Sequence, residues 1–102
     1  MSIYIHNVKG SSKISQKPPF PYTSWLDYWE HNGGSKIQEN VTYKCPGCGK
    51  LITRKSFDGC HVQKLGLVDL KWYIVPLCDS CNHRTDMFSV NENLLIPVPS
   101  NL

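Results

Sequence analysis

The sequence is dominated by two short segments, Cys45-Pro46-Gly47-Cys48 and Cys78-Asp79-Ser80-Cys81. Each segment places two cysteines three positions apart, a spacing that lets two thiolates reach one tetrahedral metal ion. Pro46 and Gly47 favour a tight turn between the first two sulfurs, and Gly49 permits the positive φ that turns backbone amides toward them. We therefore predict one structural zinc ion with four thiolate ligands and no open position for a substrate. The predicted ligands are Cys45, Cys48, Cys78 and Cys81.

The chain has five cysteines, which could also form disulfide bonds or a redox site. A disulfide scaffold is disfavoured because the count is odd, residues 1–10 lack the apolar core of a signal peptide, and four cysteines form close pairs. A redox pair is expected alone, after a strand in a thioredoxin-like pattern. We therefore expect a reducing compartment, most simply the cytoplasm. Since no apolar run reaches the length of a membrane span, we expect no membrane partner.

The length and charge of the chain limit the remaining possibilities. At 102 residues it is expected to be one small domain, for which a bound metal would supplement a small core. The formal charge of +3 does not by itself indicate a nucleic-acid-binding protein. Between positions 44 and 64, however, the only acid is Asp58. These cations could offset the charge of the zinc thiolates or contact phosphate groups. The cations of this stretch are Lys44, Lys50, Arg54, Lys55 and Lys64.

Local patterns predict a small α+β domain. Residues 1–22 contain a flexible Gly10-Ser11-Ser12 and an extended Pro18-Pro19-Phe20-Pro21, so we expect an N-terminal arm there. The single zinc-binding domain is then expected over 23–102, with its zinc core over 41–90. The predicted elements are a helix over 23–31, strands over 41–44, 51–54, 60–63 and 72–75, a helix over 79–88, and an extended apolar tail over 94–99 that forms an edge strand.

The helix over 23–31 has recognisable ends. Ser24 is placed to cap it, Asp27 stands where a capping-box acid belongs, and Asn32-Gly33-Gly34 is expected to end it. Trp25 and Trp29 share one face, where they would either anchor the helix on the core or offer a stacking platform for bases.

The strands over 60–63 and 72–75 are expected to form an antiparallel hairpin with a long loop between them. We expect Pro76 to end the second of these strands, because proline cannot donate to a ladder of hydrogen bonds.

The order of these features is that of a treble-clef zinc finger: a knuckle, strands, a hairpin, and a helix that carries the second cysteine pair. Asp58-Gly59-Cys60-His61-Val62, followed by a hairpin loop and the run from Ile74 to Asn82, resembles the zinc-containing His-Asn-His (HNH) endonucleases. The resemblance covers about Cys45 to Arg84. It implies a ββα-metal core in which a hairpin and a helix hold a second, catalytic divalent cation beside the structural zinc.

The resemblance also implies roles for individual residues. His61 corresponds to the general base that activates water for attack on a phosphodiester. Asn82 corresponds to a ligand of the catalytic metal, and His83 is placed to substitute for it. Arg84 or Lys64 would hold the phosphate.

Two positions depart from the family's pattern. Cys60 stands where the family has an Asp or His ligand immediately before the base, and a thiolate suits zinc better than magnesium. The family's central Asn would fall near Trp72 or Tyr73, and the nearest polar candidate is Asp69.

These observations lead to two functional hypotheses. The first is a zinc-binding HNH-like protein that cleaves or binds DNA or RNA, with His61, Asn82 and His83 as its working site. The second is a non-catalytic zinc module that contacts a protein partner. In that module His61 would be a hydrogen-bonded core residue or a spare ligand, and Cys60 a small buried apolar residue.

Overall fold

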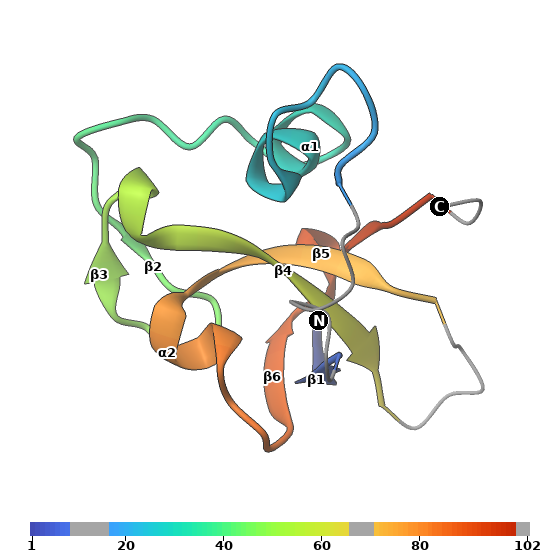
Figure 1. The fold of residues 1–102 in the computed structure, drawn as a ribbon. Helices are drawn as coiled ribbons and strands as arrows, with labels where there is room; N and C mark the ends of the chain where they lie inside the picture. The colour runs from blue at the N-terminus through green and yellow to red at the C-terminus, as the bar shows by residue number, and fades with distance from the viewer. Residues whose placement is uncertain (9–16, 66–70, 100–102) are drawn as a thin grey trace.

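A five-stranded antiparallel sheet with the strand order β6-β1-β4-β5-β7 forms the centre of the molecule (Figure 1). The computed structural model describes residues 1–8, 17–65 and 71–99. The expectation of a small α+β domain is confirmed. In chain order the elements are β1 (Ser2–Asn7), α1 (Trp25–His31), β2 (Tyr43–Lys44), β3 (Leu51–Ile52), the 3₁₀ helix η2 (Arg54–Ser56), β4 (Phe57–Lys64), β5 (Tyr73–Cys78), α2 (Asp79–Asn82), β6 (Phe88–Asn91), the 3₁₀ helix η3 (Glu92–Leu94) and β7 (Ile96–Pro97).

The central hairpin, β4–β5, has the predicted antiparallel pairing but is longer than expected. β5 continues through Pro76, which lies opposite Gly59, and ends at Cys78. The expected strand end at Pro76 is therefore wrong. β7 pairs with β5 only at Tyr73 and Ile74, so among the described residues Pro76 faces no strand on its second side. A proline is tolerated at such an edge position. The connection between β4 and β5 lies largely outside the described residues.

β1 is an integral part of the sheet, although the sequence suggested an arm over residues 1–22. It lies between β4 and β6, with Ile5 opposite both Lys64 and Phe88. Ile5 is fully buried and Ile3 is partly buried beside it, whereas Tyr4 between them is exposed. This alternation is typical of a strand with one face on the core. The first part of the expected arm therefore forms a strand of the sheet, and residues 9–16 lie outside the described ranges.

The helix expected over 79–88 is also wrong beyond its first turn. α2 ends at Asn82, and the chain then turns into β6, which pairs with β1. The Asn7 side chain donates hydrogen bonds of 2.9 Å to the carbonyls of Cys81 and Arg84, so it satisfies acceptors at the end of this short helix. In β6 the side chains of Phe88 and Val90 are buried. Burial of these two side chains favours a strand over a longer helix.

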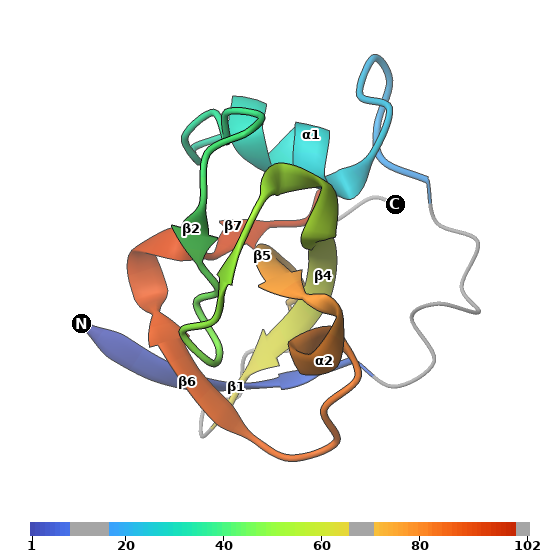
Figure 2. The same ribbon diagram turned by 90° about the vertical axis from the view of Figure 1, so that its left-hand side faces the viewer.

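α1 covers one face of the β4–β5 hairpin, as Figures 1 and 2 show. Its predicted start is confirmed, because the amide of Asp27 donates to the Ser24 hydroxyl over 3.0 Å. Its predicted end is confirmed too, because α1 stops before Asn32. Trp25 and Trp29 are both buried, and the Trp29 indole donates a 2.7 Å hydrogen bond to the carbonyl of Leu94. The two tryptophans therefore anchor the helix on the core.

Further contacts fix α1 to the rest of the fold. The Tyr28 hydroxyl donates to the carbonyl of Pro97 over 2.8 Å. The buried Glu30 carboxylate forms an ion pair with Arg54 of η2 at 2.7 Å and accepts the amide of Ile37, also at 2.7 Å. Burial alone would raise the pKa of Glu30, but these hydrogen bonds hold it below its ordinary value. Glu30 is therefore a charged residue that links α1 to η2.

The strands expected over 41–44 and 51–54 are present as the shorter β2 and β3, which form an antiparallel ribbon in which Tyr43 lies opposite Ile52. β7 forms the edge strand expected in the tail. In the described part of the chain, no helix is both long and apolar enough to cross a membrane.

Candidate metal centre

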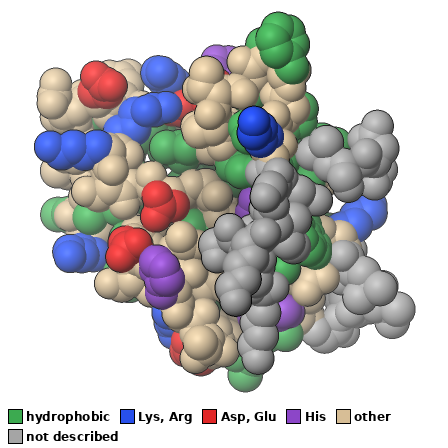
Figure 3. Space-filling view, viewed as in Figure 1, with side chains coloured by type: hydrophobic (Ala, Val, Ile, Leu, Met, Phe, Trp, Pro, Cys, Tyr) green, Lys and Arg blue, Asp and Glu red, His purple; other side chains and the backbone are tan. Residues whose placement is uncertain are grey.

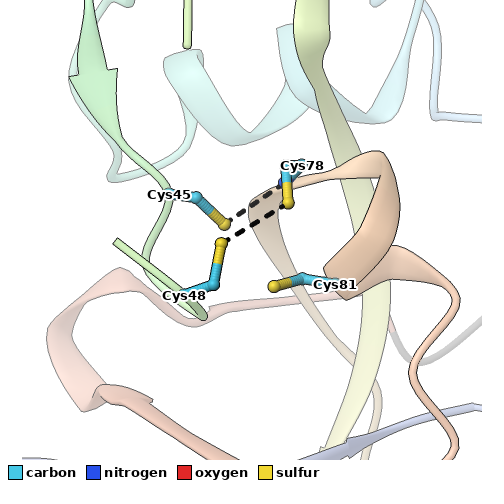
Figure 4. Close-up of side chains that lie close together, drawn as sticks. All are labelled: Cys45, Cys48, Cys78 and Cys81. Atoms are coloured by element: carbon cyan, nitrogen blue, oxygen red, sulfur yellow. Dashed lines mark hydrogen bonds between the residues drawn. The ribbon is translucent and has the colours of Figure 1, made fainter. Parts of the chain in front are cut away.

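The four predicted ligands converge on one point, although they come from separate parts of the chain. The four Sγ atoms all lie within 4.8 Å of one another, and the side chains point toward a shared centre in Figure 4. The Sγ atoms of Cys48 and Cys78 are 3.8 Å apart. A tetrahedral zinc with Zn–S bonds of about 2.3 Å separates its sulfurs by about 3.8 Å. The cluster is thus compatible with a structural metal site.

The first pair is positioned by a tight turn between β2 and β3. The amide of Cys45 donates to the carbonyl of Lys50, and the amide of Gly49 donates back to the carbonyl of Cys45, both over 2.8 Å. Gly49 has a φ of +79°, as the sequence predicted. The turn holds Cys45 in a buried position and leaves Cys48 exposed.

The second pair comes from the junction of β5 and α2. Cys78 is the residue that precedes the first turn of α2, and Cys81 lies within that turn. The amide of Cys78 donates to Cys45 Sγ over 3.3 Å, so it joins the two halves of the centre directly. A strand that continues past Pro76 is what brings Cys78 to this position.

The surroundings shift the pKa of three of these thiols, those of Cys45, Cys78 and Cys81, in different directions. Burial alone would raise the pKa of Cys45, but hydrogen bonds from the amides of Cys78, Gly47 and Cys48 lower it to about 7. Burial raises the pKa of both Cys78 and Cys81. A divalent cation would displace the remaining protons, because its charge stabilises thiolates strongly. The chemistry of this donor set therefore fits a soft divalent ion.

Cys60 lies in a different environment from the other cysteines. It is buried in the core with Val62 and Leu77, and its thiol donates to the carbonyl of Asp58 over 3.3 Å. Burial, and then the charge of Asp58, raise the pKa of Cys60. Cys60 therefore behaves as a small buried residue that keeps its proton.

The side chain of His61 lies on the face of β4 opposite to that of Cys60, because successive side chains of a strand alternate between its two faces. Its imidazole is flanked by Trp25 and Trp72, with ring centroids at 4.8 and 5.6 Å and both contacts edge-to-face. Nε2 of His61 is buried and has no hydrogen-bond partner among the described residues. Burial lowers the pKa of His61, so the neutral ring is favoured.

Asn82 and His83 lie at the end of α2 and face different surroundings. His83 is exposed, and its Nδ1 lies 2.8 Å from the carbonyl of Asp79 and 3.4 Å from its carboxylate. Asn82 is half-buried and borders an open depression of about 480 Å³ between α1, η2 and the start of β4. The depression is lined by Ser24, Trp25, Leu26, Arg54, Lys55, Phe57, Asp58, Gly59 and Asn82.

The two residues considered as phosphate ligands already have partners. Arg84 forms an ion pair with Asp86 at 2.6 Å and lies over the ring of Phe88. Lys64 contacts Glu92 at 3.2 Å and lies over the ring of Tyr73.

The residues proposed for a second cation do not add a second cluster of three His, Cys, Asp or Glu ligands. Within the described ranges, the four cysteines are the one group of three or more His, Cys, Asp or Glu side chains whose ligand atoms lie close enough to hold an ion. Cys60, His61 and His83 do not form another such group.

Sequence reasoning missed the contact that covers His61. A Cβ atom added at Gly59 would lie 2.5 Å from the amide nitrogen of Leu26 and 2.7 Å from the carbonyl carbon of Trp25. The backbone of α1 thus packs directly on β4 at Gly59, on the same face as His61. The available signal was Gly59 itself, since a glycine inside a strand often marks a close backbone approach.

Comparisons of this chain with protein-family models, curated proteins and solved structures found no match.

Proposed function

We propose that this chain is a non-catalytic zinc module of the HNH-like, treble-clef type, in which one zinc ion holds a small binding domain together. The observation that carries the proposal is the convergence of four sulfur atoms within 4.8 Å. With four thiolates the coordination is complete, so the zinc is structural and activates no water.

The order of elements supports the HNH-like assignment. The first cysteine pair lies in the turn of the β2–β3 ribbon, the β4–β5 hairpin follows, and α2 carries the last cysteine immediately after β5. His61 lies on the first strand of that hairpin and Asn82 at the end of the helix, as the family pattern requires.

The surroundings of His61 support binding over hydrolysis. The family's metal ligand before the base is replaced by Cys60, whose side chain lies in the core on the other face of β4. On the face of His61, α1 packs against Gly59, and Trp25 contacts the imidazole. Nε2 of His61 is itself buried, so a phosphodiester would reach it only if the groups around the imidazole moved away.

Metal analysis of two matched variants tests the zinc assignment. We expect one zinc per chain in the native protein and in Cys60→Ala, whereas Cys78→Ala loses the metal and the cooperative unfolding transition. The same number of cysteines is removed in each variant, so only the position differs. A metal-free chain that is as stable as the metal-loaded one would refute the assignment.

Metal-assisted hydrolysis is the second candidate, and one observation favours it. Asn82 borders an open depression that also contains Asp58, so a carboxylate and an amide face the same space. This candidate predicts cleavage of plasmid DNA or RNA with added manganese, nickel or magnesium, and its loss in His61→Ala while zinc is retained. Such cleavage would refute the non-catalytic proposal. If the nucleic acid stays intact with all three ions, the non-catalytic proposal is supported.

A further inference from the structure

The four cysteines of the metal centre differ sharply in exposure. Cys45, Cys78 and Cys81 are buried, each with an exposed fraction of at most 5%. Cys48, in contrast, is exposed. In the view of Figure 3, the surface over β2, β3 and α2 shows mainly polar and charged side chains, with small hydrophobic areas between them. The centre therefore lies mostly below the surface, and Cys48 is the ligand that a small molecule in solution meets first.

The first turn itself covers Cys81. A Cβ atom added at Gly47 would lie 2.8 Å from Sγ of Cys81 and 3.1 Å from Cε2 of Phe88. The backbone of Gly47 thus packs directly on the sulfur of Cys81, beside an aromatic ring. Arg84 lies over the same ring, with its guanidinium carbon 4.5 Å from the ring centroid. A reagent therefore has little access to Cys81 while the turn is in place.

Cys45 is held by hydrogen bonds in addition to being buried. Its Sγ accepts the amide of Cys78 over 3.3 Å and also the amides of Gly47 and Cys48. Such bonds stabilise the charge of a thiolate and so make it a weaker nucleophile. The Sγ of Cys48 has a different neighbour, the Sγ of Cys78 at 3.8 Å, and a dashed line joins the two atoms in Figure 4.

This arrangement is typical of a redox-sensitive site. Oxidation by peroxides favours a thiolate that is exposed to solvent and has a second cysteine beside it. Metal binding supplies the thiolate form, because zinc binds deprotonated sulfur. Cys60 does not compete, since it is only 2% exposed and lies outside the metal centre.

We propose that Cys48 is the site at which peroxides oxidise the metal centre, and that Cys78 then forms a disulfide with it and lowers the affinity for zinc. This inference rests on the proposed zinc module and adds a reversible redox switch to it.

The reaction consumes one peroxide for two thiolates. The Cys48 thiolate attacks one oxygen of hydrogen peroxide, so that an S–O bond forms, the O–O bond breaks and hydroxide leaves. The Cys78 thiolate attacks the sulfur of the resulting sulfenic acid, so that an S–S bond forms, the S–O bond breaks and a second hydroxide leaves. The two sulfurs lose two electrons, the peroxide gains them, and solvent protons convert both hydroxides to water. Only Cys45 and Cys81 then remain as ligands, which is too few for a closed tetrahedral site.

The test treats the zinc-loaded chain with a small excess of hydrogen peroxide. A chromogenic chelator records zinc release, and differential alkylation with mass spectrometry identifies the oxidised and paired cysteines. Cys48→His is compared with Cys81→His, because histidine also binds zinc and both variants offer three sulfurs and one nitrogen. Cys60→Ala removes the thiol outside the centre. Zinc content is measured in every sample before peroxide is added.

We expect Cys48 to be the first cysteine modified in the native chain, with a Cys48–Cys78 disulfide as the product and loss of the bound zinc. Zinc release from Cys48→His should be at least about tenfold slower than from the native chain. Cys81→His keeps both reacting thiolates and should remain sensitive, and Cys60→Ala should match the native chain. A thiol reductant with added zinc should restore the metal content.

Several results would overturn the proposal. The native chain could keep its zinc and its thiols in peroxide, or Cys60 could be modified before Cys48. A disulfide between Cys45 and Cys48 would overturn the role of Cys78, and equal rates in Cys48→His and Cys81→His would overturn that of Cys48. If a histidine variant does not bind zinc, the order of modification in the native chain still decides. A native chain without zinc before peroxide is added would refute the zinc module itself, so the two failures are distinguishable.

Discussion

The metal centre and the surroundings of His61 come from the same stretch of sequence but are organised in opposite ways. At the metal centre, four side chains from a turn, a strand end and a helix point to one place. Around His61, the neighbouring candidate Cys60 points to the other face of the sheet, and His83 is exposed beside Asp79. The difference shows that residues close together in the sequence can either converge on one site or be separated onto opposite faces of a strand.

Local geometry explains this difference. Residues three apart in a tight turn or in the first turn of a helix project in similar directions, so each cysteine pair is already close before the pairs meet. Residues adjacent on a strand project to opposite faces. Cys60 and His61 could share an ion only if β4 were distorted there, and the regular pairing of Cys60 with Val75 and of His61 with Ile74 gives no such distortion.

Removal of the metal should have the largest effect on stability, because the two cysteine pairs are then no longer joined. A strong chelator is expected to eliminate the cooperative thermal transition, since structural zinc sites contribute about 10–16 kcal/mol of apparent binding free energy at neutral pH. Circular dichroism follows the loss, and added zinc should restore the signal. A chelated chain with an unchanged melting temperature would contradict the prediction.

Truncation of Trp25 should expose the imidazole of His61 to solvent. Trp25→Leu removes the ring that contacts His61, and a loss of roughly 2–4 kcal/mol in the free energy of unfolding is expected from the cavity. NMR titration of His61 should then show its pKa moving up toward the ordinary value. Phe20→Leu is the matched control, because Phe20 is 97% exposed. Equal effects of the two substitutions would refute the covering role of Trp25.

Loss of the charge on Glu30 tests the link between α1 and η2. In Glu30→Gln the Arg54 guanidinium loses its ionic partner, and we expect a cost of about 1–3 kcal/mol with zinc retained. Denaturant unfolding measures the change. Glu39→Gln, at an exposed position, should cost little. The prediction fails if both variants are equally stable.

The pH dependence of stability gives the smallest effect. Burial lowers the pKa of His61 in the folded chain, whereas an unfolded histidine titrates near about 6.5. Below that value the unfolded chain takes up a proton more readily, so the free energy of unfolding falls as the pH falls. His61→Gln should show a shallower decline than the native chain between about pH 7 and 5. Acid-driven loss of zinc is common to both proteins and cancels in the comparison.

Sequence reasoning was most successful where spacing alone determines geometry. The cysteine pairs, the cap at Ser24 and the positive φ of Gly49 all follow from residues within a few positions of one another. The β4–β5 hairpin follows from two strand patterns that are neighbours in the sequence. Sequence reasoning failed where the secondary structure depends on residues far apart in the chain. Neither the pairing of β1 between β4 and β6 nor the early end of α2, where the Asn7 side chain reaches Cys81, can be read from local patterns.

The same limit applies to the candidate catalytic residues. Sequence could place His61 on a strand and Asn82 on a helix, but it could not show that α1 lies over Gly59 or that Trp25 and Trp72 flank the imidazole. Those contacts join residues far apart in the chain. They place the Nε2 atom of His61 out of contact with solvent.

X-ray absorption at the zinc edge of the purified, metal-loaded chain tests the central claim most directly. Four thiolates from Cys45, Cys48, Cys78 and Cys81 predict a single shell of four sulfur atoms at about 2.3 Å with no nitrogen or oxygen neighbour. A shell that contains a nitrogen, an oxygen from water, or fewer than four sulfurs would contradict a closed structural centre. A nitrogen neighbour would indicate that His61 or His83 is a zinc ligand.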